Sequence, residues 1–462
     1  MVSIVILASG FSNRMGRDKL IIEFKGIKII EHTILNAVKS KADEVLVVYR
    51  DEIIKKIAET YGAKAVINEN AHNGQSQAVI CGIKNLNIRD GVLFLPGDMP
   101  FFDVESINRL IDEYEKTKKI VCPVCLFKRR APVIFPQGYI NDLLSLTGDI
   151  GGRAILEKNN DVSEVAFKNL KLFWDIDELN DLKYSSGETV IIRGAGDIAS
   201  GVALRLFRCG FNIIMLETNN PSVIRRRVAF ASAVFNKEAD VEGVKGILAG
   251  YSDIESIWRI GAIPVIIDEN LDILNHIEVD ILIDAILAKK NLGMMKSMAP
   301  LTIGLGPGFE AGVDVHAVIE TNRGHNLGRV YYKGFAEKNT GTPGDVLGFK
   351  EERVLRAPCN GKVILVKDIG DFVKKGETLL MVNELEVKSK IDGIVRGIIK
   401  DGYEVLEGMK IGDVDPRGKK EYCFTVSEKA LAIAGGVLEA ILNFRMNKRG
   451  GESGGKGYSK NT

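Results

Sequence analysis

The segment from Leu7 to Lys19 is a glycine-containing, basic loop that directly follows an apolar stretch. Small residues at positions 8–10 let the backbone approach a phosphate chain, and exposed backbone N–H groups can hold its oxygens. Arg14 and Lys19 would bring positive charge to a triphosphate and to a pyrophosphate leaving group. An ordinary strand-to-helix turn with surface cations explains this density of Gly, Arg and Lys less well. The predicted nucleotide-binding residues of the loop are Leu7, Ala8, Ser9, Gly10, Ser12, Arg14 and Lys19.

Asp98 is a second residue at which chemistry is expected. It follows an apolar stretch in the segment 95–100 (LPGDMP), and ligands of open α/β sheets bind outside the carboxyl ends of the strands. Nucleotidyl transfer needs a cation at the phosphates, and Mg²⁺ prefers carboxylate oxygens and waters. An Asp after a strand is also common as a turn former or helix cap, but its occurrence together with the basic loop favours a metal ligand. Arg14, Lys19 and Asp98 are therefore the predicted catalytic residues.

The loop resembles the LAxGxSxRMGxxK signature of the MobA-like nucleotidyltransferases, in particular their molybdenum cofactor cytidylyltransferase branch. The resemblance implies transfer of CMP from CTP to a molybdopterin-type cofactor, with release of pyrophosphate and with Mg²⁺ at Asp98. The segment 68–82 (NENAHNGQSQAVICG) resembles the second nucleotide-contacting stretch of this family. This match implies that Gly74, Gln75 and Ser76 bind the nucleotide close to its base.

Two later segments extend the resemblance. The segment 147–153 (TGDIGGR) resembles the element near the acceptor, which implies Asp149, Gly151 and Arg153 as substrate-binding residues. The segment 175–182 (DIDELNDL) is similar to the closing D-x-D-T-P-E-D-L element of the family. It implies Asp177 as a second metal position, although the same letters also read as the start of a helix.

The sequence departs from the family pattern at two places. Position 9 is Ser where the family has Ala or Gly, and the segment 130–132 (RAP) replaces a GHP-like element. The second change removes an expected polar contact at the acceptor site. The choice of CTP over GTP rests on Ser9 and on the stretch 74–76, so GTP stays open as the alternative.

The elements that would position these residues belong to a multidomain α/β chain, because 462 residues exceed one ordinary core. Apolar strands alternate with helical patterns in the first part, which predicts a Rossmann-like, mostly parallel sheet with helices on both faces. A polar linker at 183–188 leads to a second α/β region. Later, short strands separated by Gly predict a small all-β barrel-sandwich module, and the polar C-terminus predicts disorder. The predicted domains are 1–185 (nucleotidyltransferase), 189–351 (second Rossmann-like domain), 352–398 (β module), 399–446 (segment with a closing helix) and 447–462 (tail).

The second α/β region begins with a glycine pattern of its own. Gly194, Gly196 and Ala199 fit G-x-G-x-x-G/A, and Glu217 closes the next strand about 20 residues later. The pattern predicts a nucleotide-like ligand at Gly194, Gly196, Asp197 and Glu217. NAD-dependent hydride transfer would be a sharper interpretation, but the sequence offers no partner residues for it.

From about Thr189 to Met446 the chain resembles the YqeB accessory proteins associated with selenium-dependent molybdenum hydroxylases. The segments that carry the resemblance are 193–203 (RGAGDIASGVA), 221–233 (PSVIRRRVAFASA), 241–244 (VEGV), 304–328 (GLGPGFEAGVDVHAVIETNRGHNLG) and 412–418 (GDVDPRG). The resemblance implies a pathway rather than a mechanism, with a molybdenum hydroxylase apoenzyme as the partner.

The stretch 304–328 also carries several side chains that could bind a ligand. His316, Arg323 and His325 are predicted as further ligand residues of this region, with an anion pocket built on Arg323 and the glycine backbone as the simplest site. Residues 225–227 (RRR) are further candidate donors. A metal site is a second interpretation, although the spacing of the two histidines matches no compact ligand motif. A glycine-rich structural loop is the third.

The β module at 353–398 resembles half of a biotinyl/lipoyl-type barrel. A carrier lysine would have to lie at a hairpin tip, where this chain has VNELEV at 382–387. We therefore expect an interaction or packing module and no covalently carried cofactor.

Composition restricts the remaining classes of function. With 45% hydrophobic and 27% charged residues and a net charge of +1, the chain has the balance of a globular protein and no global field for nucleic acid or an anionic membrane. No apolar run has the length of a membrane span, and the N-terminus lacks the basic region of a signal peptide. Six scattered cysteines favour a reducing cytoplasm. Cys122 and Cys125 form a CxxC, but it lies in a strand-like run, which favours a structural role.

Taken together, these features predict a fused maturation enzyme for molybdenum hydroxylases. The first domain would make a nucleotide derivative of the molybdenum cofactor, and the second half would bind that cofactor. One alternative is a nucleotidyltransferase for sugar phosphates or polyols, since the same sheet and loop serve those acceptors. Another is a cofactor-binding chaperone without transferase activity, against which the presence of Arg14, Lys19 and Asp98 argues.

Overall fold

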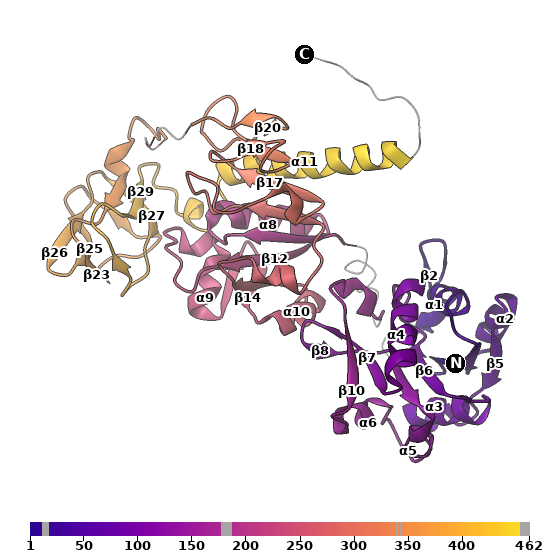
Figure 1. The fold of residues 1–462 in the computed structure, drawn as a ribbon. Helices are drawn as coiled ribbons and strands as arrows, with labels where there is room; N and C mark the ends of the chain where they lie inside the picture. Colours follow the sequence, from indigo (N-terminus) through magenta and orange to yellow (C-terminus); the bar gives the residue numbers. More distant parts are fainter. Residues whose placement is uncertain (12–17, 177–186, 339–340, 342–343, 453–462) are drawn as a thin grey trace. The chain divides into compact units, whose positions relative to one another are not determined.

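The computed structural model describes residues 1–11, 18–176, 187–338, 341 and 344–452. The chain divides into two compact units (Figure 1). The first comprises Met1–Ser186 with Asn275–Glu278, and the second comprises Gly187–Leu274 with Val279–Thr462. The division falls within the segment that was predicted to be a linker.

The N-terminal unit is built on a mixed sheet. β1, β4, β5 and β6 are parallel neighbours, as the alternation of strands and helices predicts. β9 is antiparallel to β6 and β7, and the short β8 (Lys128–Arg129) pairs with β7. In spatial order the sheet contains β10 (Val162–Ala166), β7 (Ile120–Cys125), β9 (Val133–Pro136), β6 (Gly91–Pro96), β1 (Val2–Ala8), β4 (Glu44–Tyr49) and β5 (Lys64–Ile67).

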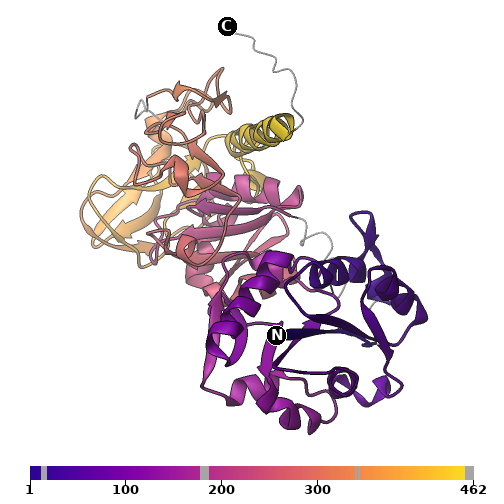
Figure 2. The same cartoon turned by 45° about the vertical axis from the view of Figure 1, so that its right-hand side comes forward.

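Helices lie on both faces of this sheet, which Figure 2 shows edge-on in indigo and purple. Val5 of β1 packs with Val79 and Ile83 on one face, whereas successive residues of a strand point to opposite faces. Ile4 and Ile6 are fully buried as well, so β1 has the continuous apolar pattern of a strand covered on both sides. The helices are α1 (Ile29–Val38), α2 (Glu52–Thr60), α3 (Gln75–Lys84), α4 (Val104–Thr117), α5 (Ile140–Leu144) and α6 (Arg153–Lys158).

Cys122 and Cys125 lie on β7 and are both buried. Burial raises the pKa of the Cys122 thiol to about 11. Little of the reactive thiolate is therefore present at neutral pH. This environment is that of a structural cysteine rather than a redox site.

The second unit contains a nine-stranded sheet. The parallel strands β15, β12, β11, β16, β17 and β19 follow the spatial order 3-2-1-4-5-6 of a doubly wound dinucleotide-binding sheet. In spatial order the strands are β13 (Glu238–Val241), β14 (Val244–Leu248), β15 (Ile263–Ile267), β12 (Asn212–Glu217), β11 (Thr189–Arg193), β16 (Ile281–Asp284), β17 (Leu301–Leu305), β19 (Ala317–Ile319) and β20 (Val330–Tyr331).

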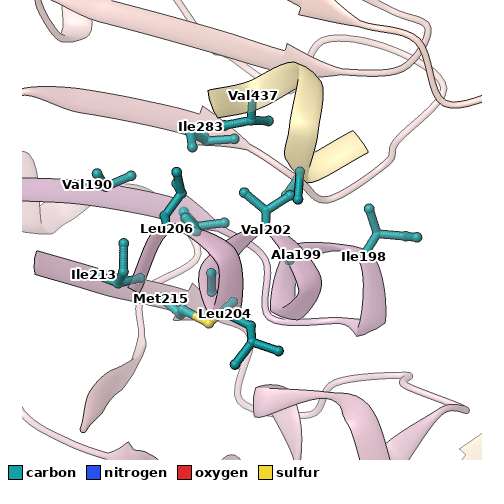
Figure 3. Close-up of a cluster of buried hydrophobic side chains, with 14 of the residues drawn as sticks. Val190, Ile198, Ala199, Val202, Leu204, Leu206, Ile213, Met215, Ile283 and Val437 are labelled. Atoms are coloured by element: carbon teal, nitrogen blue, oxygen red, sulfur yellow. The ribbon is translucent and has the colours of Figure 1, made fainter. Parts of the chain in front are cut away.

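The core of the second unit lies between this sheet and its helices. Figure 3 shows Val202 of α8 (Asp197–Arg208) and Val437 of α11 (Glu428–Glu452) among side chains from the strands. Gly201 allows the close approach of these two helices, since a Cβ there would lie 2.7 Å from the Cβ of Ala430. The smaller helices of this unit are α9 (Ala233–Asn236) and α10 (Ile254–Arg259).

The β module consists of two four-stranded sheets, as expected for a barrel-sandwich type. It extends beyond the predicted boundary at 398, because β28 and β29 complete the two sheets. The tip of the hairpin between β25 and β26 is formed by Asn383 and Glu384, so no lysine occupies the carrier position. The first sheet contains β22 (Val354–Arg356), β29 (Lys410–Asp415), β27 (Gly393–Ile398) and β24 (Phe372–Val373); the second contains β26 (Leu385–Lys388), β25 (Thr378–Val382), β23 (Gly361–Leu365) and β28 (Glu404–Val405).

The closing helix is longer than predicted. α11 runs from Glu428 to Glu452, so the expectation of disorder from 447 is wrong for residues 447–452. Ala430 and Ile433 near the start of this helix are buried in the core, and the polar residues of this stretch continue the same helix. None of the helices in the described parts of the chain combines the length and the apolar character needed to span a membrane.

Candidate functional site

Four polar or charged residues follow the four neighbouring parallel strands of the N-terminal unit. Ser9 follows β1, Arg50 follows β4, Asn68 follows β5 and Asp98 comes two residues after β6. The registers align Ala8 with the end of β4 and the preceding residue with the end of β6. These side chains therefore start from one edge of the sheet, where open α/β sheets bind their ligands.

The predicted catalytic residues Lys19 and Asp98 are in direct contact. Lys19 Nζ donates a hydrogen bond to Asp98 Oδ2 over 2.5 Å, and both side chains are 18% exposed. The backbone holds Asp98 beside the loop, because Gly97 N donates to Leu7 O over 3.0 Å. A Cβ at Gly97 would lie 3.1 Å from the same carbonyl oxygen, so glycine permits this close approach. These contacts connect the chain just after β6 to Leu7 and Lys19, the first and last residues of the basic loop.

Three predicted site residues of this unit lie outside the described residues: Ser12, Arg14 and Asp177. Ile176, which precedes Asp177, is buried, and its N–H donates to Asp98 O over 3.4 Å. Ile176, the last described residue of the closing element, thus contacts the backbone of Asp98, the predicted metal ligand.

Ser9 and Asn68 form a buried contact between two strand ends. Asn68 Nδ2 donates to Ser9 Oγ over 2.9 Å, and the two residues are 5% and 3% exposed. Ala or Gly at position 9 would leave this Asn68 donor without its acceptor. Ser9, which departs from the family pattern, therefore has Asn68 as a hydrogen-bond partner in this chain.

The second predicted nucleotide-binding stretch meets the predicted acceptor loop. Ser76 N donates to Gly148 O over 3.1 Å, and Gln75 N donates to Asp149 Oδ1 over 3.3 Å. Gly74 has φ +101°, and a Cβ there would collide with the backbone of Gly148. The Ser76 side chain is fully buried, whereas Gln75 is exposed. Ser76 thus holds the two loops together through its backbone, and Gln75 is the side chain available to a ligand.

The predicted acceptor residues are only partly gathered. Gly151 lies against Gln75, since a Cβ at Gly151 would be 2.9 Å from Gln75 Oε1. Arg153 begins α6, and its side chain is 81% exposed and pairs with Glu157 at 2.7 Å on the same helix. The structure therefore places Asp149 and Gly151 beside the nucleotide stretch and leaves Arg153 on the surface.

Arg50 is a cation of this edge that the motif analysis missed. Its NH2 lies 3.3 Å from Asp18 Oδ2, and its guanidinium carbon lies 4.4 Å from the ring centroid of Phe11. It thus contacts both sides of the segment 12–17. The rule that pointed to Asp98, a polar residue directly after a buried strand, applies equally to Arg50 and could have identified it.

The residues at this edge fit a Mg²⁺ ion that arrives with a nucleotide. The described residues contain no group of three or more His, Cys, Asp or Glu side chains that could hold a metal by themselves. Mg²⁺ in phosphoryl-transfer sites is commonly held by one or two carboxylates together with substrate phosphates. Asp98, partly exposed beside the cationic Lys19, provides such a carboxylate.

In the second unit the glycine pattern lines a cavity of about 680 Å³. Gly194, Gly196, Asp197 and Glu217 all contribute to its wall. Glu217 Oε2 accepts from Ala195 N and Oε1 accepts from its neighbour's N–H, each over 2.8 Å. Burial raises the pKa of Glu217, which these N–H bonds only partly offset.

The other three predicted ligand residues of this unit do not line that cavity. His316 Nδ1 lies 2.8 Å from Thr302 Oγ1, and burial lowers its pKa. Arg323 pairs with Glu428 of α11, and His325 is exposed. These residues therefore lie away from the glycine pattern, because His316 precedes β19 whereas the cavity lies at the opposite, carboxyl ends of the strands.

Comparisons with known proteins agree with the two units. Residues 4–162 match the family model of the MobA-like NTP transferase domain. The chain is 52% identical over 259 residues to YqeB of Escherichia coli (strain K12), covering 56% of this chain and 48% of YqeB. It therefore spans about half the length of that relative.

Two further relatives match shorter parts of the chain. A Natranaerobius thermophilus protein named "Probable molybdenum cofactor guanylyltransferase" is 27% identical over 194 residues, which cover 39% of this chain and 93% of the relative. A 3-deoxy-manno-octulosonate cytidylyltransferase of Coxiella burnetii is 26% identical over 119 residues, which cover 25% of this chain and 48% of the relative. Residues 4–162 thus match the MobA-like NTP transferase domain, and more than half of the chain is similar to YqeB.

Proposed function

We propose that the N-terminal unit transfers CMP from CTP to the terminal phosphate of a molybdopterin-type cofactor, and that the second unit binds this cofactor for delivery to a molybdenum hydroxylase apoenzyme. The observation that carries the transferase is the contact of Lys19 with Asp98 at the ends of the basic loop and of β6. The acceptor rests on two independent resemblances, a relative named for molybdenum cofactor guanylyl transfer in the first half and YqeB in the second.

The proposed reaction is a displacement at the α-phosphorus of the nucleotide. An oxygen of the acceptor phosphate forms a new P–O bond to this phosphorus, and the bond to the β-phosphate bridging oxygen breaks. Pyrophosphate leaves with the bonding electron pair. Mg²⁺ held by Asp98 would neutralise charge on the phosphates.

The residues of this chain have separate roles in this scheme. Lys19 binds the phosphates and offsets the charge that develops on the leaving group. Ser9 and Asn68 fix the start of the loop through their hydrogen bond. Gln75 is the exposed side chain of the stretch predicted to lie near the base.

The resemblances and the relatives bear on the choice of nucleobase. CTP is favoured by the resemblance at Ser9 and at 74–76 and by the cytidylyltransferase relative. GTP is favoured by the relative named a guanylyltransferase, whose length is almost fully covered.

Pyrophosphate release tests the proposal directly. The full chain is incubated with Mg²⁺ and either CTP or GTP, with purified molybdopterin-type cofactor, with sugar phosphates, or with no acceptor. Release that requires both CTP and the cofactor is the expected result. Release with GTP alone overturns the choice of base, and release with sugar phosphates alone overturns the acceptor. Absence of turnover with every acceptor, while the cofactor still binds, overturns the transferase and leaves a cofactor-binding chaperone.

A further inference from the structure

Two ion pairs flank the carboxyl end of β1 in the N-terminal unit. Lys19 pairs with Asp98 after β6, whereas its neighbour Asp18 pairs with Arg50 after β4. β4 and β6 are the strands on either side of β1. Because neighbouring strands lie about 4.8 Å apart, the ends of β4 and β6 are separated by about 10 Å. A cation therefore lies on each side of the strand that leads into the basic loop.

Phe11 and Asp18 hold the guanidinium group of Arg50. Its carbon lies 4.4 Å from the centroid of the Phe11 ring, and NH2 donates to Asp18 Oδ2 over 3.3 Å. This is the one hydrogen bond that the group makes with the described residues. A guanidinium that stacks on a ring uses its face, which leaves the N–H donors in its plane for other acceptors. The Arg50 side chain is 34% exposed, so a ligand from solvent can reach it.

The stability of the loop does not require Arg50 at this position. Asp18 caps the short helix Lys19–Ile21, because its Oδ1 accepts from Leu20 N over 3.1 Å, and this bond is independent of Arg50. Phe11 is 48% exposed, so its contact with the guanidinium buries little apolar surface. Partly exposed ion pairs and cation–π contacts contribute little to the stability of a fold. The two contacts orient Arg50 at a ligand-binding edge more than they stabilise the protein.

A phosphate chain is the ligand that fits the donors of Arg50. The planar fork of an arginine side chain binds phosphate oxygens in pairs, and an open α/β sheet binds its ligands outside the carboxyl ends of its strands. We propose that Arg50 is a phosphate-binding residue of the N-terminal unit. It holds the phosphate chain of the nucleotide on the β4 side of β1, while Lys19 holds it on the β6 side.

Inorganic tripolyphosphate is the probe for this role, because it has the phosphate chain of the nucleotide without a base or a ribose. The inference rests on the proposed function for the identity of the nucleotide, whereas binding of this probe requires no transfer reaction. Its affinity for the full chain is measured calorimetrically with Mg²⁺, alongside the affinities for CTP and GTP. Arg50→Gln should weaken tripolyphosphate and the preferred nucleotide at least tenfold at an unchanged melting temperature.

Arg109→Gln is the matched control. The guanidinium carbon of Arg109 also lies over a phenylalanine ring, 4.1 Å from the centroid of Phe167. Phe167 follows β10, the edge strand of the same sheet, so this arginine lies away from the ends of β1 and β4. The control variant should bind tripolyphosphate and the nucleotide as the wild type does.

A second variant separates phosphate binding from a role in fastening the loop to β4. Asn caps helices as well as Asp does, so Asp18→Asn keeps the cap but removes the negative charge that competes for Arg50. Tripolyphosphate should therefore bind to Asp18→Asn as tightly as to the wild type, or more tightly. Weaker binding to Asp18→Asn would show that the Arg50–Asp18 pair only shapes the loop. This test stands by itself if Arg50→Gln folds poorly.

The outcomes distinguish this inference from the proposed function. Failure of the wild-type chain to bind tripolyphosphate, or equal affinities of the wild type and Arg50→Gln, would overturn the inference. Arg50-dependent binding of tripolyphosphate in a chain that releases no pyrophosphate with any acceptor would support the inference and overturn the transferase. Pyrophosphate release by Arg50→Gln with a wild-type KM for the nucleotide would support the transferase and overturn the inference.

Discussion

Lys19 Nζ and Asp98 Oδ2 lie 2.5 Å apart, although 79 positions separate the two residues in the sequence. The pair connects the end of the basic loop to the carboxyl end of β6, and each side chain stays partly accessible. A cation for phosphates and a carboxylate for a metal are thus held together at one point of the sheet edge. This arrangement is the basis of the first prediction.

Replacement of Asp98 by Asn should reduce turnover about a hundredfold or more, while triphosphate binding changes by only a few-fold. The amide keeps the size of the side chain but loses the charge with which it would hold Mg²⁺, whereas the loop still holds the phosphates. The kcat for pyrophosphate release and the Kd for the nucleotide give the two readouts. Asp112→Asn is the control, since Asp112 pairs with Lys41 at 2.6 Å on the surface of the same unit. Wild-type turnover in Asp98→Asn would remove this carboxylate from the mechanism.

The buried contact between Ser9 and Asn68 should show energetic coupling. A hydrogen bond between buried side chains contributes about 1 kcal/mol, and leaving one partner unsatisfied costs about 1–3 kcal/mol. Ser9→Ala and Asn68→Ala should therefore each destabilise the protein, and the double variant should lose about 1 kcal/mol less than the sum. Urea unfolding of the four proteins measures this cycle. Strictly additive losses would show that the two side chains act independently, and the contact would then not be what fixes the start of the loop.

Gly74 should not tolerate a side chain. Its φ of +101° is unfavourable for other residues, and an added Cβ would collide with the backbone of Gly148. Gly74→Ala should therefore separate the nucleotide stretch from the acceptor loop and raise the KM for the nucleotide. Gly138→Ala, at an exposed position with no heavy atom within 4 Å of a Cβ, should leave the KM unchanged. Equal KM values for the two variants would show that the contact of the two loops does not position the nucleotide.

The residues of the N-terminal site that could be predicted from the sequence are those that follow the ends of apolar strands. Polar residues directly after apolar strands identified Asp98, and the same rule applied to Arg50 would have found it. The contact of Gly74 with Gly148 could not be derived in this way, because it joins two loops whose approach depends on how α3 and α5 pack. The exposure of Arg153 could not be predicted either. The sequence does not show whether the first residue of a helix contacts a ligand or, as Arg153 does, a residue one turn further along.

In the second unit the glycine pattern predicted a Rossmann-like domain, and its four residues line one wall of the cavity. The separation of His316 and Arg323 from this wall could not be predicted, because sequence proximity within 304–328 does not reveal which end of a parallel strand a residue occupies. The two sheets of the β module extend beyond the predicted boundary at 398. β29 returns to pair with β22 across more than 50 residues, and such long-range pairing leaves no local signal.

Acidification should destabilise the protein partly through Asp415. Burial alone would raise the pKa of this carboxyl, but hydrogen bonds from Arg417 and the nearby charge of Arg396 outweigh it and hold the pKa below its ordinary value. A carboxyl with a depressed pKa in the folded state contributes stability above its unfolded pKa of about 4, and this contribution is lost as the pH falls through the lower folded value. Urea unfolding midpoints between pH 7 and pH 3 should therefore fall less steeply for Asp415→Asn than for the wild type.

Arg417→Gln keeps this test valid if Asp415→Asn folds poorly. Arg417 is 25% exposed and donates to both oxygens of Asp415 over 2.9 and 2.6 Å, so its loss should raise the pKa of the carboxyl. The folded pKa then lies closer to the unfolded value, so the unfolding midpoint of Arg417→Gln should fall less between pH 5 and pH 3 than that of the wild type. Glu238→Gln is the control, because Glu238 is 57% exposed and pairs with Lys245 on the surface of the same unit. A wild-type pH profile for Arg417→Gln would show that the Arg417–Asp415 pair does not couple protonation to folding.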